Sequence, residues 1–282
     1  MQKVRPSDFS KDLSRLSLGN IALCTISNDA FAVGTKVLLH SFLDHNPWFS
    51  GDLIVFTNAR AASLSLQNKK DLQSISNKVT FYEIDYSRYS KVYDRFSKIF
   101  LGKPQMRFLP SFFTYEAFEL TSKYDRVLYL DSDMLVISDI SDVFLIDSKV
   151  PVVTPDAGEF SLDRSFVNFN GGFIYLTSNV ERGIRDQLLE YSLLANDHAL
   201  ADQSIMNAFF KGNVLALDSR YNCLKRCFPD SKYSKFDSSI KVIHYVGAKP
   251  WHANKKGREL EYRQLENLWH LELKKIHANG RK

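Results

Sequence analysis

An apolar run that ends in two acidic residues constrains this chain most, at residues 127–133 (VLYLDSD). A short, continuous apolar run is typical of a strand buried on both faces of a parallel sheet. Because alternate side chains of an extended strand share a face, Asp131 and Asp133 are expected to point the same way, about 6–7 Å apart. Open α/β sheets bind ligands at the carboxyl ends of such strands. The run therefore predicts an α/β fold with an acidic site at one edge of its sheet.

The purpose of this acidic pair stays open at this point. Two close carboxylates repel each other unless a proton or a cation neutralises them. A hard divalent cation does so, and it can also bind a diphosphate. The same pair could instead cap a helix or meet an arginine. Asp131 could also be the nucleophile of a phosphatase, because haloacid-dehalogenase-like enzymes carry Asp-x-Asp after an apolar strand.

Strand-like and helix-like segments alternate in the first half of the chain. The expected strands are residues 20–26, 52–56, 79–84 and the run that ends at Asp131, and the expected helices are residues 30–43, 60–76, 88–100 and 111–121. Strands that alternate with helices form parallel sheets covered by those helices. The expected fold is a doubly wound, mostly parallel sheet flanked by helices.

The second half of the chain is expected to complete the same domain. Its expected strands are residues 150–154, 172–176 and 241–245, and its expected helices are residues 180–194, 201–210 and 259–276. A chain of 282 residues suits one large α/β domain. We expect a polar N-terminal leader (residues 1–19), a single α/β domain (residues 20–252) and a basic, aromatic-containing helical tail (residues 253–282).

Composition indicates a cytoplasmic protein. Residues 1–10 are polar and lack the apolar core of a signal peptide. No uninterrupted apolar stretch is long enough to span a bilayer. The three cysteines are too few for a disulfide framework.

The net charge of +5 comes from the C-terminal end alone. Residues 249–282 hold nine Lys or Arg against four Asp or Glu, so the rest of the chain is balanced. The expected helix there carries large apolar residues along one side, namely Tyr262, Leu265, Trp269, Leu273 and Ile276. Such a helix could bind peripherally to the anionic inner face of a membrane, or it could pack on the core. Charge confined to one short tail disfavours nucleic-acid binding.

Three later segments could bring further polar groups to the acidic pair. Residues 169–173 (FNGGF) are expected to form a tight turn before a strand, and their glycines would let the backbone approach a ligand. Asp202 opens an expected helix and could be only its N-cap. His244 ends the last expected strand, and Gly247 and Lys249 follow it closely. A metal ligand, a glycine and a cation thus lie close together in the sequence.

Together these residues resemble glycosyltransferase family 8, which includes glycogenin and bacterial lipopolysaccharide galactosyltransferases. The resemblance rests on four ordered segments: residues 25–31, LYLDSDMLV, FNGGFIYL with the later DQSIMN, and HYVGAKPW. It runs from about residue 20 to Trp251. It implies a single GT-A domain that transfers a hexose, with glucose or galactose favoured, from a UDP-sugar with retention of configuration. The acceptor would be a saccharide, a glycoprotein or a lipid-linked molecule.

The resemblance also implies a metal centre with a diphosphate beside it. Mn²⁺, or Mg²⁺ in its place, would be bound by Asp131, Asp133 and His244. Mixed carboxylate and imidazole ligation suits Mn²⁺ better than Ca²⁺, and the ion would neutralise the UDP leaving group as a Lewis acid. Lys249 and the backbone at Gly247 would hold the diphosphate where negative charge develops.

Further site residues follow from the same resemblance. The positions that match contacts to the base, the ribose and the rest of the donor are Thr25, Asn28, Phe31 and Ser132. Asn170, Asp202 and Gln203 match positions around the transferred sugar. Gln203 would lie near the anomeric carbon in a same-face attack, and no protein nucleophile is assigned.

Two departures from the family pattern concern the donor. Phe31 stands where members often have Tyr, so ring stacking is kept and a hydroxyl is lost. Residues 114–118 contain no Arg or Lys, although members often use one there to reach the donor. Arg107 or Lys103, further upstream, are the candidate substitutes.

Two rival functions remain. The first is the phosphatase, whose motif usually lies near the N-terminus and needs a later acidic pair, whereas here the motif is in the middle of the chain. The second is a protein of the same fold that binds nucleotide sugars or carbohydrates without catalysis. The presence of all three expected metal ligands disfavours this second alternative.

Overall fold

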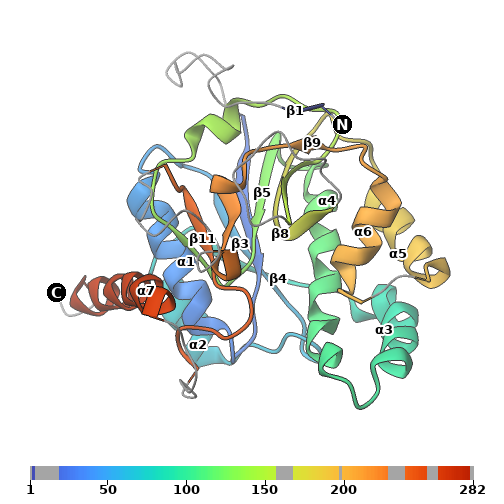
Figure 1. Cartoon of the computed structure of the whole chain (residues 1–282), viewed down its shortest axis with the longest axis horizontal. Helices are drawn as coiled ribbons and strands as arrows, with labels where there is room; N and C mark the ends of the chain where they lie inside the picture. Colours follow the sequence, from blue (N-terminus) through green and yellow to red (C-terminus); the bar gives the residue numbers. More distant parts are fainter. Residues whose placement is uncertain are drawn as a thin grey trace.

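An eight-stranded sheet lies at the centre of the fold, in the order β1, β9, β7, β8, β5, β2, β3, β4 (Figure 1). Its strands are β1 (Gln2–Lys3), β2 (Ile21–Ile26), β3 (Asp52–Thr57), β4 (Val79–Glu83), β5 (Arg126–Leu130), β7 (Val152–Pro155), β8 (Phe169–Thr177) and β9 (Leu215–Ala216). The computed structural model describes residues 2–3, 19–156, 168–196, 199–227, 239–252 and 260–279.

The sheet is mostly parallel, as the alternation of strands and helices predicts. β5 pairs in parallel with β2, β2 with β3, and β3 with β4. β8 runs antiparallel to both of its neighbours, β5 and β7. Residues 127–130 of β5 are at most 1% exposed. The apolar run is therefore a strand buried on both faces, which confirms that prediction.

Helices cover both faces of the sheet (Figure 1). On one side lie α1 (Ala32–His45), α2 (Leu66–Gln73) and α7 (Leu260–Asn279), and on the other lie α3 (Tyr86–Phe100), α4 (Glu116–Leu120), α5 (Ile184–Leu194) and α6 (Asp202–Phe210). Short 3₁₀ helices occur at Pro104–Tyr115, Ser141–Leu145, Ser219–Asn222 and Lys225–Cys227. Each helical layer buries its own apolar cluster against the sheet, so the predicted α/β fold class is confirmed.

Two expected helices are shorter than the sequence indicates. The helix expected at residues 60–76 begins only at Leu66, where the Ser65 hydroxyl caps it by accepting a backbone N–H of the first turn. The helix expected at residues 111–121 starts as part of a longer 3₁₀ helix that contains Pro110. Proline has no N–H to donate to an α-helical hydrogen bond, so regular α-helix forms only beyond it.

Residues 169–173 were predicted to form a tight turn. They form the first half of β8 instead. It pairs with β7 on one side, and the register between these strands shifts at Val153 and Thr154. Every residue of β8 is buried. The two glycines therefore lie inside the sheet, where they admit close neighbours.

A second sheet contains the strand expected at residues 241–245, together with two strands that periodicity did not indicate. It consists of β10 (Cys223–Leu224), β11 (Val242–His244) and β6 (Met134–Val136), with β11 in the middle. β6 and β11 are antiparallel, and His244 pairs with Met134. The backbone N–H of Tyr245 donates to the Asp133 carbonyl at 3.0 Å. This pairing joins the end of β11 to the acidic segment.

The C-terminal helix α7 packs on the core. Trp269 is fully buried, and Leu265 and Ile276 are 1% and 5% exposed. The Glu272 carboxylate contacts His40 of α1 at 2.6 Å. The apolar side of the predicted tail helix is thus covered by protein, and residues 253–259 and 280–282 of the tail lie outside the described residues.

The structure describes only a small part of the predicted N-terminal leader. In the predicted leader, β1 pairs with β9, and residues 4–18 lie outside the described part of the chain. Among the described helices, none combines the length and the apolar character needed to cross a bilayer.

Candidate functional site

A cavity of about 440 Å³ opens beside the carboxyl ends of β2 and β5. The residues singled out in the sequence that line it are Asn28, Phe31, Asp131, Ser132, Asp133, Asn170, Asp202, Gln203, His244, Gly247 and Lys249. Thr25 does not line it. That residue is fully buried in β2, and its hydroxyl has no hydrogen-bond partner among the described residues. Segments far apart in the sequence thus meet at one cavity.

The two acidic residues lie in a turn rather than on the strand. β5 ends at Leu130, and the N–H of Met134 donates to the Asp131 carbonyl at 3.1 Å. The expectation that an extended strand points both carboxylates the same way is therefore wrong in its geometry. The turn still brings them together, because ligand atoms of Asp131, Asp133 and His244 all lie within 4.8 Å of one another.

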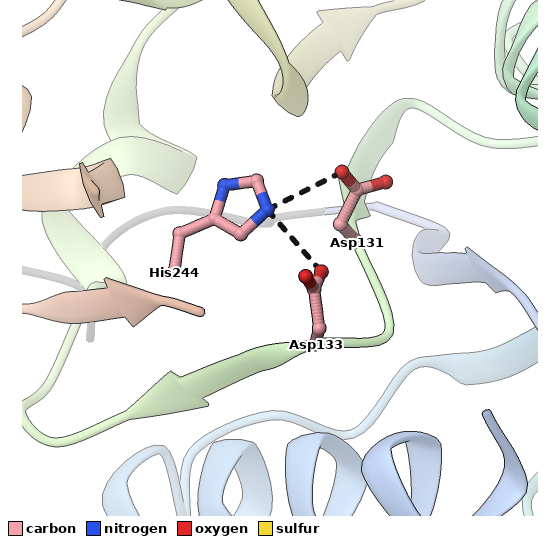
Figure 2. A group of neighbouring side chains, drawn as sticks. All are labelled: Asp131, Asp133 and His244. Atoms are coloured by element: carbon pink, nitrogen blue, oxygen red, sulfur yellow. Dashed lines mark ion pairs between the residues drawn. The ribbon is translucent and has the colours of Figure 1, made fainter. Parts of the chain in front are cut away.

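His244 points its Nε2 atom between the two carboxylates (Figure 2). This nitrogen lies 3.5 Å from Asp131 Oδ2 and 3.2 Å from Asp133 Oδ1. The other ring nitrogen, Nδ1, lies 2.9 Å from the side-chain oxygen of Asn222. Because an amide oxygen only accepts, Nδ1 carries a proton, and Nε2 is the ring nitrogen that faces the acids. This is the arrangement in which a neutral histidine binds a metal ion.

Gly172 leaves room for two of the three ligands. A Cβ atom at this position would lie 2.6 Å from His244 Cε1 and 2.7 Å from Asp131 Oδ2. The N–H of Asp131 also donates to the Gly172 carbonyl at 2.9 Å, so β8 holds the turn directly. The Tyr129 hydroxyl donates to Asp131 Oδ1 at 2.7 Å and orients that carboxylate. Two carboxylates, one imidazole and a space kept open by glycine fit a divalent cation such as Mn²⁺. We call Asp131, Asp133 and His244 the carboxylate cluster.

Lys249 contributes a positive charge to this cluster. Its Nζ atom forms an ion pair with Asp133 and donates to the Tyr245 carbonyl at 3.0 Å. Burial raises the pKa of Asp131, and the nearby Asp133 charge adds to that rise. Burial acts on Asp133 in the same direction, but His244 and Lys249 outweigh it and hold its pKa below the ordinary value. Both acids would ionise readily beside a divalent cation.

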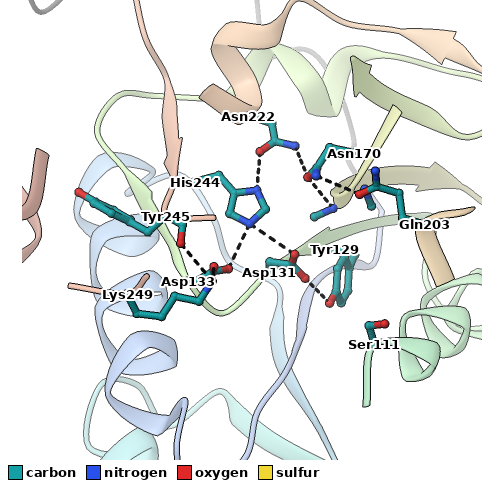
Figure 3. Close-up of polar contacts among 12 residues, drawn as sticks. Ser111, Tyr129, Asp131, Asp133, Asn170, Gln203, Asn222, His244, Tyr245 and Lys249 are labelled. Atoms are coloured by element: carbon teal, nitrogen blue, oxygen red, sulfur yellow. Dashed lines mark hydrogen bonds and ion pairs between the residues drawn. The ribbon is translucent and has the colours of Figure 1, made fainter. Parts of the chain in front are cut away.

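A chain of side-chain amides forms a second wall of the cavity, which Asn170 and Gln203 line and which Asn222 joins to His244 (Figure 3). Asn222 donates to the Asn170 oxygen at 2.9 Å, and Asn170 donates to the Gln203 oxygen at 3.0 Å. Backbone N–H groups of Gly171 and Gly172 also donate to Gln203 and Asn170, at 3.2 and 3.0 Å. Because each amide oxygen is already accepting, the orientation of every amide group is set. We call Asn222, Asn170 and Gln203 the amide network.

Two charged residues of the cavity lining extend the amide network. Gln203 donates through Nε2 to Asp156 at 3.1 Å, and Asp156 forms an ion pair with Arg226. Both Asp156 and Arg226 line the cavity. Arg107 lines it too, whereas Lys103 is absent from the lining, so Arg107 is the better placed of the two candidate donor contacts.

Asp202 is a buried acid next to the amide network. α6 begins at Asp202 itself, with Ala201 as the preceding cap residue, so Asp202 is not the N-cap. Burial raises the pKa of Asp202 to about 7, although a hydrogen bond from the Ser111 hydroxyl opposes the rise. This carboxyl group can therefore exist in either protonation state near neutral pH.

The other end of the cavity is lined by an aromatic ring and a capped turn. The Asn28 side chain accepts the N–H of Phe31 at 3.1 Å and so shapes the entry into α1. The ring of Phe31 lies 5.7 Å from that of Trp251, edge to face. The Lys249 Nζ atom lies 5.8 Å from the centre of the Phe31 ring. An aromatic face and a cation are thus adjacent at this end.

Several residues of the site were not predicted. Tyr129, Ser111 and Asn222 position the acids and the histidine, and Asp156 and Arg226 belong to the wall. Tyr129 could have been suspected, because it lies two residues before Asp131, in the strand that leads to it. Asn222 has no such signal, because it lies in a short 3₁₀ helix far from the other site residues in sequence.

Comparison with known families and proteins gives one consistent result. A family model described as "Glycosyl transferase family 8" matches residues 20–255. Glycosyltransferase GlyF of Streptococcus pneumoniae is 31% identical over 167 residues, which is 56% of this chain and 40% of that protein. The lipopolysaccharide 1,2-glucosyltransferase of Escherichia coli is 30% identical over 166 residues, which is 50% of this chain and 48% of that protein. The matches therefore span less than half the length of either relative.

A solved structure has the same fold. It is that of galactosyltransferase LgtC in complex with donor and acceptor sugar analogues, with a TM-score of 0.65 and 17% sequence identity. The similarity covers 90% of this chain and 95% of that one. The likeness identifies a GT-A fold, as predicted.

Proposed function

Because the chain belongs to glycosyltransferase family 8, we propose that it transfers a hexose from a UDP-sugar to a saccharide, glycoprotein or lipid-linked acceptor, with retention of configuration. Glucose and galactose are the favoured sugars, since one relative is named a glucosyltransferase and one structural neighbour a galactosyltransferase. The observation that carries the proposal is the carboxylate cluster, whose ligand atoms lie within 4.8 Å of one another at the cavity.

The carboxylate cluster would bind the metal ion, with Mn²⁺ favoured and Mg²⁺ as a substitute. When bound, the ion supplies Lewis-acid stabilisation of the leaving diphosphate. His244 is prepared for this role by Asn222, which keeps its proton on Nδ1. Asp131 is prepared by the Tyr129 hydroxyl. These partners orient the ligands before any ion arrives.

The remaining residues would bind the two ends of the donor. Phe31 would stack on the base, and Lys249 and the backbone of Gly247 would hold the diphosphate. Lys249 forms an ion pair with Asp133 in the structure, so holding the diphosphate would require the lysine to turn from this partner toward the donor.

The amide network would surround the transferred sugar. Its amide groups are oriented by one another and by the backbone of β8, so little side-chain freedom would be lost on binding. Gln203 would lie nearest to the anomeric carbon, and Asp202 would contact the same sugar. Arg107 would supply the positive charge that residues 114–118 lack.

The proposed reaction is tested by UDP release. The purified chain is incubated with UDP-glucose or UDP-galactose and Mn²⁺, and the free UDP formed as the hexose passes to water is measured with and without EDTA. We expect metal-dependent release from one donor, with a loss of about 10²–10³-fold or more in Asp133→Asn, because the ion can no longer be held at the leaving group. Asp139→Asn, in an acid that lies outside the cavity lining, is the matched control.

Three results would distinguish the rivals. UDP release that survives both EDTA and Asp133→Asn would overturn the metal-dependent transferase. Metal-dependent binding of UDP-sugars without any turnover would favour the non-catalytic binding protein. Magnesium-dependent hydrolysis of small phosphoesters, without UDP release, would favour the phosphatase.

A further inference from the structure

The helix α7 contacts a loop that forms one end of the cavity. The loop comprises residues 245–252 and contains Gly247 and Lys249, which line the cavity. The family model that matches this chain ends at residue 255, before α7 begins. Any function of α7 at the cavity is therefore carried by a part of the chain outside that match.

Three aromatic rings connect α7 to the cavity. Trp269 of α7 is fully buried, and its ring lies 5.3 Å from that of Trp251 in the loop. Trp251 in turn lies 5.7 Å from Phe31, edge to face. Aromatic contacts at these distances are favourable. A displacement of Trp269 would therefore shift Trp251, which contacts Phe31 directly.

Trp251 has little freedom to move independently. Its indole N–H donates to the Ala30 carbonyl at 3.1 Å. Its ring lies so close to α1 that a Cβ atom at Gly34 would be 2.5 Å from it. The ring thus lies between α1 and Trp269, so α7 supports the loop on the side away from α1.

Two further contacts join α7 to the same loop. The Tyr245 hydroxyl donates to the Leu265 carbonyl at 2.6 Å. The Lys225 ammonium donates to the Ala248 carbonyl and lies 3.8 Å from the Glu266 carboxylate. These contacts do not involve the three rings. Residues in the first half of α7 therefore support the loop at several points.

We propose that α7 positions the loop for the nucleotide half of the donor, and that Trp269 is its main positioning residue. The inference rests on the proposed function, because it assigns the end of the cavity at Phe31 and Lys249 to UDP. Trp269 itself is absent from the cavity lining, so it acts through Trp251. The tail helix is then a part of the donor site.

Trp269→Ala is tested against Ile276→Ala. Ile276 is a buried residue of the same helix, 5% exposed and about two turns beyond Trp269, and it controls for lost packing of the helix. Binding of UDP in the presence of Mn²⁺ is measured by calorimetry, and binding of Mn²⁺ alone is measured separately. We expect Trp269→Ala to weaken UDP binding by about three- to tenfold. Mn²⁺ binding should change little, and Ile276→Ala should leave UDP affinity at the wild-type level.

Trp269→Phe and hydrogen exchange complete the test. The Trp269 N–H has no hydrogen-bond partner among the described residues, so a phenyl ring should restore UDP affinity. Amide exchange in residues 245–252 should be faster in Trp269→Ala than in Ile276→Ala. Equal UDP affinity or equal exchange in the two alanine variants would overturn the inference. If the wild type binds no UDP, the proposed function fails, and exchange alone decides whether α7 supports the loop.

Discussion

The two walls of the cavity are held by different chemistry. The carboxylate cluster consists of charged or ionisable groups, and the Lys249 ammonium forms an ion pair with one of them, Asp133. The amide network consists of neutral groups that satisfy one another and the backbone of β8. The first wall therefore depends on what binds to it, whereas the second is ordered before any ligand arrives.

His244 is the residue where the two walls meet. Its Nε2 atom faces the carboxylates, and its Nδ1 atom contacts Asn222 of the amide network. The amide network, through Asn222, can therefore set the orientation of the His244 ring beside the carboxylates. In the proposed function, the neutral amides would provide geometry and the charged groups would provide affinity.

The largest difference between the two walls is expected in Mn²⁺ affinity, when two neighbouring glycines are each replaced by alanine. Gly172→Ala would place a Cβ atom against His244 and Asp131, whereas at Gly171 the nearest atom is Met206 Cε at 3.3 Å. We expect Gly172→Ala to lower Mn²⁺ affinity by about 100-fold, and Gly171→Ala to leave it nearly unchanged. Calorimetric titration of Mn²⁺ into both folded variants measures this. Equal affinities would mean that the space beside Gly172 has no role in metal binding.

An intermediate effect with two opposite signs is expected at Lys249. Lys249→Met removes the cation that pairs with Asp133, so Mn²⁺ without nucleotide should bind more tightly, by about tenfold. UDP should bind more weakly to the Mn²⁺-loaded variant, because a diphosphate contact is lost. Separate titrations of Mn²⁺ and of UDP test both signs. Lys241→Met, in a cation whose ammonium contacts the Asp139 carbonyl, is the control.

The smallest effect is expected for the pH dependence of the melting temperature when Asp202, beside the amide network, is replaced. Since the pKa of Asp202 is raised to about 7 in the folded protein, the neutral form favours folding at low pH, and this contribution is lost as pH rises through 7. Asp202→Asn removes the buried charge. Its melting temperature relative to wild type should therefore be higher at pH 8 than at pH 5, by about 2–4 °C for each kcal/mol of difference. Thermal unfolding of both proteins at the two pH values checks this, and a difference of the opposite sign would contradict it.

The sequence predicted the residue types of the charged wall better than their geometry. The apolar run before Asp131 marks a buried strand, and His244 ends a second one. The expected strand-like spacing of Asp131 and Asp133 was wrong, because the chain turns at these residues and begins β6. Periodicity indicates which segments are buried, but it does not show where a strand gives way to a turn.

The amide network was only partly predictable. Asn170 and Gln203 were selected because they match a family pattern, and both line the cavity. Asn222 was missed, because a buried asparagine in a short 3₁₀ helix has no distinctive spacing. Its importance arises only from its hydrogen bonds to His244 and Asn170.

Local properties of the sequence were enough to determine the α/β class, the buried strand before Asp131 and the kinds of ligand available, because burial and chemical type belong to single segments. The direction of β8, the meeting of Asp133 with His244 and the packing of α7 behind the cavity were decided by the tertiary structure. Each of these depends on which segments pair across long sequence separations. Such pairing follows from the joint burial of apolar surfaces and the satisfaction of polar groups, which local patterns do not contain.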